Sequence, residues 1–205
     1  SLKKFNMTDV VKAIGENAFQ GCESLENFDC TKNITTIKAG AFSNCSALKT
    51  VDIGDSVTSI GQSAFSECRI LNEIIIGKSV TVINDNAFKN CDALKEISLP
   101  DSVETIGNSA FYNCDSLAAI TIPDSVTSIG SSIFYDCDAL TDVTLGTGIT
   151  SIPSSAFEHC DVLQSIVLPY RTATVGANAF KNCVALTEIT IPRATTSIDA
   201  TAFSY

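Results

Sequence analysis

Apolar residues recur along this chain at one fixed interval of 23 residues. Phe stands at nine positions with that spacing, from Phe19 to Phe203, and Cys follows each Phe by three residues from Cys22 to Cys183. Leu keeps the same interval, and no insertion interrupts it. A fixed period of this length is the signature of a repeat protein whose units stack on one another. The pattern therefore predicts a solenoid with a continuous column of Phe side chains in its core.

One repeat unit, starting at Leu94, reads "LKEISLPDSVETIGNSAFYNC". Its first six residues contain the alternation of apolar and polar positions that is typical of a half-buried strand, with Glu96 and Ser98 facing outward. A second short extended segment follows in "SVETI", with Val103 and Ile106 facing inward. Stacked coils would join these segments into parallel sheets.

The turn that closes each unit begins at a Gly, as at Gly107, where we expect a positive φ. The residue two positions later is Asn or Ser in most units, and these residues are favourable helix N-caps. The "AFxxC" stretch that follows is therefore predicted to be one helical or 3₁₀ turn that buries Ala, Phe and Cys. The predicted caps are Asn17, Ser63, Asn86, Ser109, Ser132, Ser155 and Asn178.

The consensus "LxxIxLPxSVxxIGxxAFxxC" resembles the BspA-like (Treponema pallidum type) leucine-rich repeats from Leu2 to Phe203. This resemblance implies a right-handed, curved solenoid with a parallel sheet on its concave side. It also implies an extracellular or cell-surface location and a role in adhesion, with host matrix proteins, plasma proteins or microbial surface proteins as partners. We therefore predict one leucine-rich-repeat solenoid domain over residues 1–205, β-rich with short helical or 3₁₀ turns. It would have about nine coils, partial at both ends.

Composition narrows the possible functions. The net charge of -10 makes nucleic acid an improbable partner, since phosphate binding requires clustered Lys and Arg. No segment has the length and apolar character of a signal peptide or a membrane span. The chain lacks an initiator Met and stops at "TAFSY", so we expect it to be a segment of a longer protein.

The nine cysteines raise the question of disulfides or metal. Stacking in register would place neighbouring Cys Cα atoms within disulfide range. All side chains would then point the same way, with Cβ atoms near ~4.8 Å, beyond the usual limit of about 4.5 Å. We predict buried free thiols that reach backbone carbonyls in the turn. Cys30 lies outside the 23-residue series but replaces an inward residue, so it is also expected in the core. No CxxC pair indicates a zinc site.

No set of residues predicts catalysis. His159 is the single histidine and has no evident nucleophile beside it, so it is predicted to be an exposed turn residue. Columns of Asp near the turns are typical of solvated turn formers rather than of a calcium site. We expect no enzyme activity, metal or cofactor.

The candidate ligand-binding surface is the outward column of the longer strand, on the expected concave face. In this column Ile75 and Val167 are apolar where a polar residue is expected. A second candidate patch combines an aromatic residue with basic residues, the types enriched at interfaces: Tyr170, Arg171 and Arg193. The column itself consists of Asp29, Asp52, Ile75, Ser98, Thr121, Thr144, Val167 and Thr190.

These observations favour a non-enzymatic binding scaffold at the cell surface, whose acidic surface would prefer basic patches on a partner and bind in a salt-sensitive way. Two alternatives to this interpretation remain open. The first is a structural spacer that holds another domain away from the cell, and the second is an intracellular protein-interaction module. The sequence identifies neither the ligand nor the source organism, the oligomeric state or the redox compartment.

Overall fold

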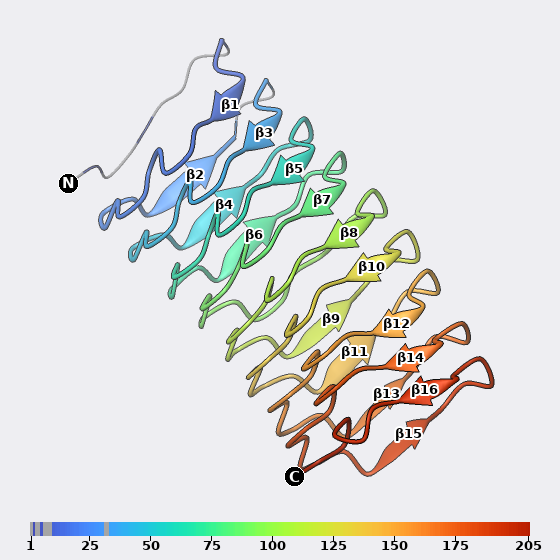
Figure 1. The fold of residues 1–205 in the computed structure, drawn as a ribbon. Helices are drawn as coiled ribbons and strands as arrows, with labels where there is room; N and C mark the ends of the chain where they lie inside the picture. The colour runs from blue at the N-terminus through green and yellow to red at the C-terminus, as the bar shows by residue number, and fades with distance from the viewer. Residues whose placement is uncertain (1, 3–4, 6–9, 31–32) are drawn as a thin grey trace.

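A computed structural model describes Leu2, Phe5 and residues 10–30 and 33–205. The chain forms a stack of similar coils with its two ends at opposite ends of the stack (Figure 1). Each strand has two or three residues, and the described residues include no helix. The fold is thus the predicted β-solenoid.

Two kinds of strand alternate along the chain. The three-residue strands are β2 (Asn27–Asp29), β4 (Thr50–Asp52), β6 (Glu73–Ile75), β9 (Ala119–Thr121), β11 (Asp142–Thr144), β13 (Ser165–Val167) and β15 (Glu188–Thr190). The two-residue strands are β1 (Ala13–Ile14), β3 (Thr36–Ile37), β5 (Ser59–Ile60), β7 (Val82–Ile83), β8 (Thr105–Ile106), β10 (Ser128–Ile129), β12 (Ser151–Ile152), β14 (Thr174–Val175) and β16 (Ser197–Ile198).

Every ladder is parallel and joins residues that are 23 apart, such as Phe28 with Val51 and Val51 with Ile74. The longer strands form the sheets β2-β4-β6, β9-β11 and β13-β15, and the shorter ones form β1-β3-β5-β7-β8-β10 and β12-β14-β16. Because the register equals the sequence repeat, each position of the unit becomes a straight column of side chains along the stack. The 23-residue period therefore determines which residues share a surface.

The shorter-strand sheet is interrupted between β10 and β12, and Pro153 explains the break. In the neighbouring coils the residue in this position donates its backbone N–H to the preceding coil: Gly130 N to Ile106 O at 2.8 Å and Gly176 N to Ile152 O at 2.9 Å. Proline has no N–H, so the equivalent bond to Ile129 cannot form.

The Phe column forms the predicted core. From Phe19 to Phe203 each ring stacks on the next, with centroids 5.1–5.6 Å apart and interplanar angles of at most 22°. At the N-terminal end, the ring of Phe5 lies edge-on against Phe19. The central rings are fully buried. Most of the stabilisation of a coil thus comes from its neighbours.

The turn that holds Phe and Cys is not helical, so the predicted N-caps are wrong. The residues in that column have positive φ, for example 57° at Asn86, and so does the residue before Cys, 58° at Asn90. Three N–H groups of this turn point along the stack, from Asn86, Phe88 and Asn90 to carbonyls of the next coil at 2.8–2.9 Å. Left-handed residues at both ends of the turn direct these N–H groups toward the neighbouring coil instead of into a helix, which is why Asn and Ser recur.

The predicted positive φ at Gly107 is also wrong, since it is not among the positive-φ glycines. A Cβ atom at this position would lie 2.4 Å from the backbone nitrogen of Asp85. Gly107 is therefore explained by the close approach of two coils rather than by a left-handed conformation.

Candidate binding surface

The outward side chains of the three-residue strands and of residues 96–98 form one exposed surface, which we call the long-strand face. The predicted ligand column lies on it in register: Asp29 pairs with Asp52, Asp52 with Ile75, Ile75 with Ser98, Thr121 with Thr144 and Val167 with Thr190. All eight residues are exposed except Asp52, which is half-buried.

The strands hold these side chains outward because their alternate residues are anchored in the core. Ile74, Ile97 and Ile120 are buried, so the residue on either side of each points to solvent. Asp52 is the exception in detail: its Oδ1 accepts the N–H of Gly54 at 2.8 Å. This bond draws the carboxylate toward its own turn and explains why Asp52 is less exposed than its neighbours.

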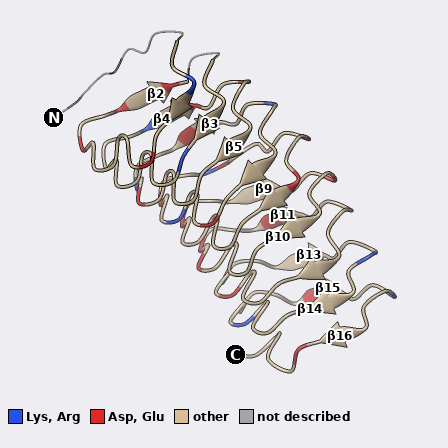
Figure 2. Ribbon diagram, turned by 45° about the horizontal axis from the view of Figure 1, so that its top comes forward, with Lys and Arg blue, Asp and Glu red and all other residues tan. Residues whose placement is uncertain are grey.

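A second outward column makes the face acidic. Glu73, Glu96, Asp142 and Glu188 occupy it, and all four are exposed. Neither Glu73 nor Glu96 has an ion-pair partner in the described part of the chain, whereas Lys49 Nζ lies 2.9 Å from Glu26 Oε2. Figure 2 shows acidic positions on several of these strands. Unpaired carboxylates on a preformed surface favour a cationic partner.

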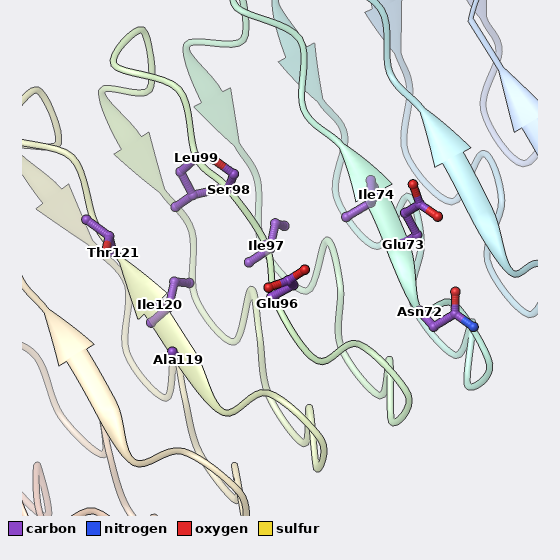
Figure 3. A pocket seen from close by; sticks show the side chains of 10 residues that line it. All are labelled: Asn72, Glu73, Ile74, Glu96, Ile97, Ser98, Leu99, Ala119, Ile120 and Thr121. Carbon is purple, nitrogen blue, oxygen red and sulfur yellow. The ribbon is translucent and has the colours of Figure 1, made fainter.

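An acidic hollow of about 550 Å³ lies on this face, lined by Asn72–Ile74, Glu96–Leu99 and Ala119–Thr121. Ile97 and its neighbours form its floor, and the side chains of Glu73 and Glu96 come from adjacent coils (Figure 3). Residues 96–98 contribute only isolated bridges rather than a strand.

A more apolar hollow of about 620 Å³ lies three coils further on and brings together the two predicted patches. Its lining contains Thr144, Val167 and Thr190 from the first patch and Tyr170 from the second. Val143, Leu145, Leu168, Pro169 and Pro192 supply further apolar surface. Sequence reasoning missed this hollow, although Val167 standing close to a Pro-Tyr turn was a usable signal.

Basic residues directly follow two residues that line the apolar hollow. Arg171 follows Tyr170 in sequence, and Arg193 follows Pro192, which also lines the hollow. Both arginines are exposed, and neither forms an ion pair within the described residues. The loops that leave β13 and β15 carry these basic positions at the edge of the stack (Figure 2). The second predicted patch thus adjoins the long-strand face.

The opposite sheet offers a different surface. There the hydroxyls of a Thr column are used between coils: Thr58 Oγ1 donates to Thr35 O and Thr81 Oγ1 to Thr58 O, both at 3.2 Å. The backbone N–H groups of the same residues donate to the same carbonyls at 2.9 Å. These donors are committed to coil stacking, so this sheet has fewer groups left for a ligand.

The cysteines form a buried column of free thiols, as predicted, and Cys22 and Cys30 are part-buried. From Cys45 to Cys183 each Sγ donates to the carbonyl oxygen of the Phe 26 residues earlier, at 2.9–3.2 Å. Burial raises the pKa of the Cys137 and Cys183 thiols to about 12. Thiols in this state are poor nucleophiles.

His159 is half-buried rather than exposed, which corrects the sequence prediction. Its Nε2 lies 3.1 Å from Nδ2 of Asn182, and its ring meets Tyr135 edge-on at 5.6 Å. The residue has positive φ, as do the Asn residues of the same column. These contacts indicate that His159 has a structural role in the packing of adjacent coils.

Two further observations concern chemistry and membranes. Among the described residues, no group of three or more His, Cys, Asp or Glu side chains is arranged to hold a metal ion. In the same part of the chain, no helix is long and apolar enough to cross a membrane.

The stacked parallel strands and their 23-residue spacing show the class of protein: it is a leucine-rich-repeat solenoid. The family model for the BspA type leucine rich repeat region matches residues 1–102 and 81–205, and the chain belongs to this family. The resemblance inferred from the consensus is thereby confirmed.

Several solved structures are similar to this chain. The Treponema pallidum leucine-rich repeat protein TpLRR is 31% identical over 79% of this chain and 78% of its own, with a TM-score of 0.74. A leucine rich cell surface protein from Faecalibacterium prausnitzii is 27% identical over 96% and 74%, with a TM-score of 0.46. The pneumococcal vaccine antigen PcpA is 19% identical over 97% and 67%, with a TM-score of 0.51. A comparison with curated proteins finds no match.

Proposed function

We propose that the protein is a non-enzymatic binding scaffold, displayed at the cell surface, that engages other proteins through the long-strand face. One observation carries the proposal: two columns of mostly exposed side chains on the same face are held in register by parallel ladders within each sheet of the longer strands. Such a surface is ordered before the partner arrives, so binding does not pay to immobilise a loop. Affinity would arise from many modest contacts spread over several coils.

The chemistry of the face indicates the kind of partner. Glu73 and Glu96 are exposed and carry no ion pair in the described chain, so a partner with a basic patch gains most from this part of the surface. Screening by salt would weaken such contacts over a Debye length of about 10 Å at 0.1 M. Membership of the BspA-type family supports surface display and adhesion, with host matrix, plasma or microbial surface proteins as partners.

The test is binding of the protein to immobilised host matrix, plasma and microbial-surface proteins, measured by surface plasmon resonance at several salt concentrations. The test variant carries Ile75→Glu, Thr121→Glu and Val167→Glu, all at exposed positions of the long-strand face. We expect it to lose binding at least tenfold, because it replaces side chains at three points of the contact and adds like charge.

A matched control carries the same three added charges on the opposite sheet: Thr58→Glu, Thr127→Glu and Thr150→Glu. These positions are exposed, and their column naturally contains Glu104, so glutamate is compatible with the fold there. The control should bind as the unmodified protein does. Equal binding by both variants would exclude the long-strand face, and the absence of any binding by the folded protein would favour a spacer role.

A further inference from the structure

We propose that the apolar hollow and the arginines beside it bind an acidic segment of the partner protein that carries a bulky apolar side chain. The inference rests on the proposed function and specifies the partner chemistry at one end of the same face. It distinguishes the acidic hollow, around Glu73 and Glu96, from the apolar hollow around Val167 and Tyr170, which has Arg171 in its turn. The strands beside the apolar hollow also carry Asp142 and Glu188.

The hollow has the size and lining of a side-chain pocket. Its volume of about 620 Å³ falls within the range of small-ligand sites, roughly 300–1,000 Å³. Val167 and Tyr170 are 76% and 68% exposed, although both are large apolar or aromatic residues that gain from being covered. The prolines at 169 and 192 hold the backbone of the rim in a restricted conformation, so little order is lost when a ligand binds.

The charge next to the hollow identifies its occupant. Arg171 and Arg193 lie directly after lining residues on adjacent coils, and no described carboxylate pairs with either. The strands that line the hollow also carry Asp142 and Glu188, but the two arginines lie in the turns that follow β13 and β15 and are unpaired. Guanidinium groups bind carboxylates in a directed, often bidentate way. An apolar side chain flanked by Asp or Glu would fill the hollow, and the flanking carboxylates would bind the arginines.

The two hollows also fix the direction of the partner. Ser98 lines the acidic hollow and Val167 the apolar one, and they are three repeats apart, which is roughly 14 Å at the usual strand spacing. A partner whose basic patch covers the acidic hollow would place its acidic segment on the arginines only in one orientation. Reversal would bring like charges together at both ends.

The test uses three short blocked peptides as probes: Asp-Glu-Phe-Glu-Asp, Asp-Glu-Ala-Glu-Asp and Lys-Arg-Phe-Arg-Lys. Binding to the isotope-labelled protein of 21.7 kDa is followed by amide chemical shifts. We expect the first peptide to bind with a Kd of about 1 mM and to shift signals of residues 143–147, 167–171 and 190–193. The alanine peptide should bind about tenfold more weakly, because it leaves the hollow unfilled.

Variants separate the two contributions. Arg171→Glu with Arg193→Glu should weaken the first peptide at least tenfold, and Arg171→Gln with Arg193→Gln should weaken it less, since it removes attraction without adding repulsion. Thr127→Glu, on the opposite sheet and away from the hollow, is the matched control and should change binding less than twofold. All these positions are exposed, so folding is not at risk.

The proposal is overturned if the first peptide does not bind, if both arginine variants bind it normally, or if the cationic peptide binds the same residues equally well. Its failure can be told apart from that of the proposed function. A protein partner that binds through Ile75 and Thr121 while the acidic peptide does not bind defeats only this inference. Peptide binding at the hollow without any protein partner upholds the site and leaves the scaffold role unsupported.

Discussion

Thr172 is a fully buried hydroxyl in a core column whose preceding members, from Ile34 to Ile149, are aliphatic. It is 0% exposed, and its Oγ1 has no hydrogen-bond partner among the described residues. The corresponding residues Val57, Val80 and Val103 are equally buried. Thr172→Val therefore keeps the shape of the side chain and removes a polar group that is unsatisfied in the folded state. We expect this substitution to stabilise the protein.

The magnitude follows from the cost of an unsatisfied buried group, which is about 1–3 kcal/mol. A valine in this position should recover about 1–2 kcal/mol, since the backbone bond from Thr172 N to Pro169 O, 2.9 Å long, is unaffected. For a protein of this size, 1 kcal/mol shifts the melting temperature by about 2–4 °C. The expected increase is therefore about 2–8 °C.

The assay is urea and thermal unfolding followed by circular dichroism, because the chain has no Trp. Thr195→Val is the matched control: Thr195 occupies the same column one coil later, and its Oγ1 donates to Thr172 O at 2.7 Å. It should lose about 0.5–1.5 kcal/mol. If Thr172→Val is neutral or destabilising, the hydroxyl of Thr172 has a partner and the reasoning is wrong.

Three further predictions concern the core and the turns. Phe111→Ala should lower the free energy of unfolding, measured in urea, by about 3–5 kcal/mol, because the ring is fully buried between two stacked neighbours. A decrease of less than about 1 kcal/mol would mean that the Phe column does not act as a continuous core. Iodoacetamide at pH 8 should label Cys22 in the native protein but Cys137 only in urea, as measured by mass spectrometry. The reason is that burial raises the pKa of the Cys137 thiol to about 12. Rapid labelling of Cys137 in the native protein would contradict its burial. Asp115→Asn should raise the urea midpoint at pH 7, and this gain should vanish toward pH 3.8. In the folded protein, burial and then the nearby Asp92 raise the pKa of the Asp115 carboxyl. Above that pKa the ionised carboxylate therefore lowers the free energy of unfolding, whereas at low pH the protonated carboxyl does not. A gain in the urea midpoint that is the same at every pH would contradict this explanation.

The architecture was predictable because a strict repeat converts sequence spacing into spatial register. The Phe and Cys columns stack as expected, and so does the outward column that contains Ile75 and Val167. Each of these predictions needed only the period and the inward or outward alternation of a strand. No distant pairing had to be guessed, since the strand ladders and the stacked Phe rings join the same position in adjacent coils.

The turn was predicted less well, because Asn and Ser are favourable in two different backbone conformations. Asn86 and Ser109 fit a helix N-cap, yet both have positive φ, and the column of Asn90 repeats this conformation four residues later. A single sequence does not separate these possibilities; the choice is made by hydrogen bonds to the adjacent coil. Gly107 was misread for a similar reason, because its constraint is the neighbouring backbone at Asp85 and not its own φ.

The hollows were not predictable from columns alone. The apolar hollow is formed by side chains from different columns of three coils, among them Val143, Val167 and Pro192. Its existence depends on how far each side chain extends from the backbone, which the period does not specify. Likewise, the break at Pro153 results from a missing donor in one coil, and its effect on the sheet appears only when the neighbouring coils are in place.

The backbone bonds between coils also determine how this protein would respond to mechanical force. Each coil is held by ladders to its neighbours, such as β7 with β8 and β8 with β10, so tension applied at the chain ends is borne first by the outermost coil. Once that coil detaches, the next becomes the outermost one and meets the same load. Each event would release 23 residues, or about 80 Å of extended chain. Under tension the molecule would therefore lengthen in equal steps from its ends, dissipating energy at each step, instead of rupturing at once.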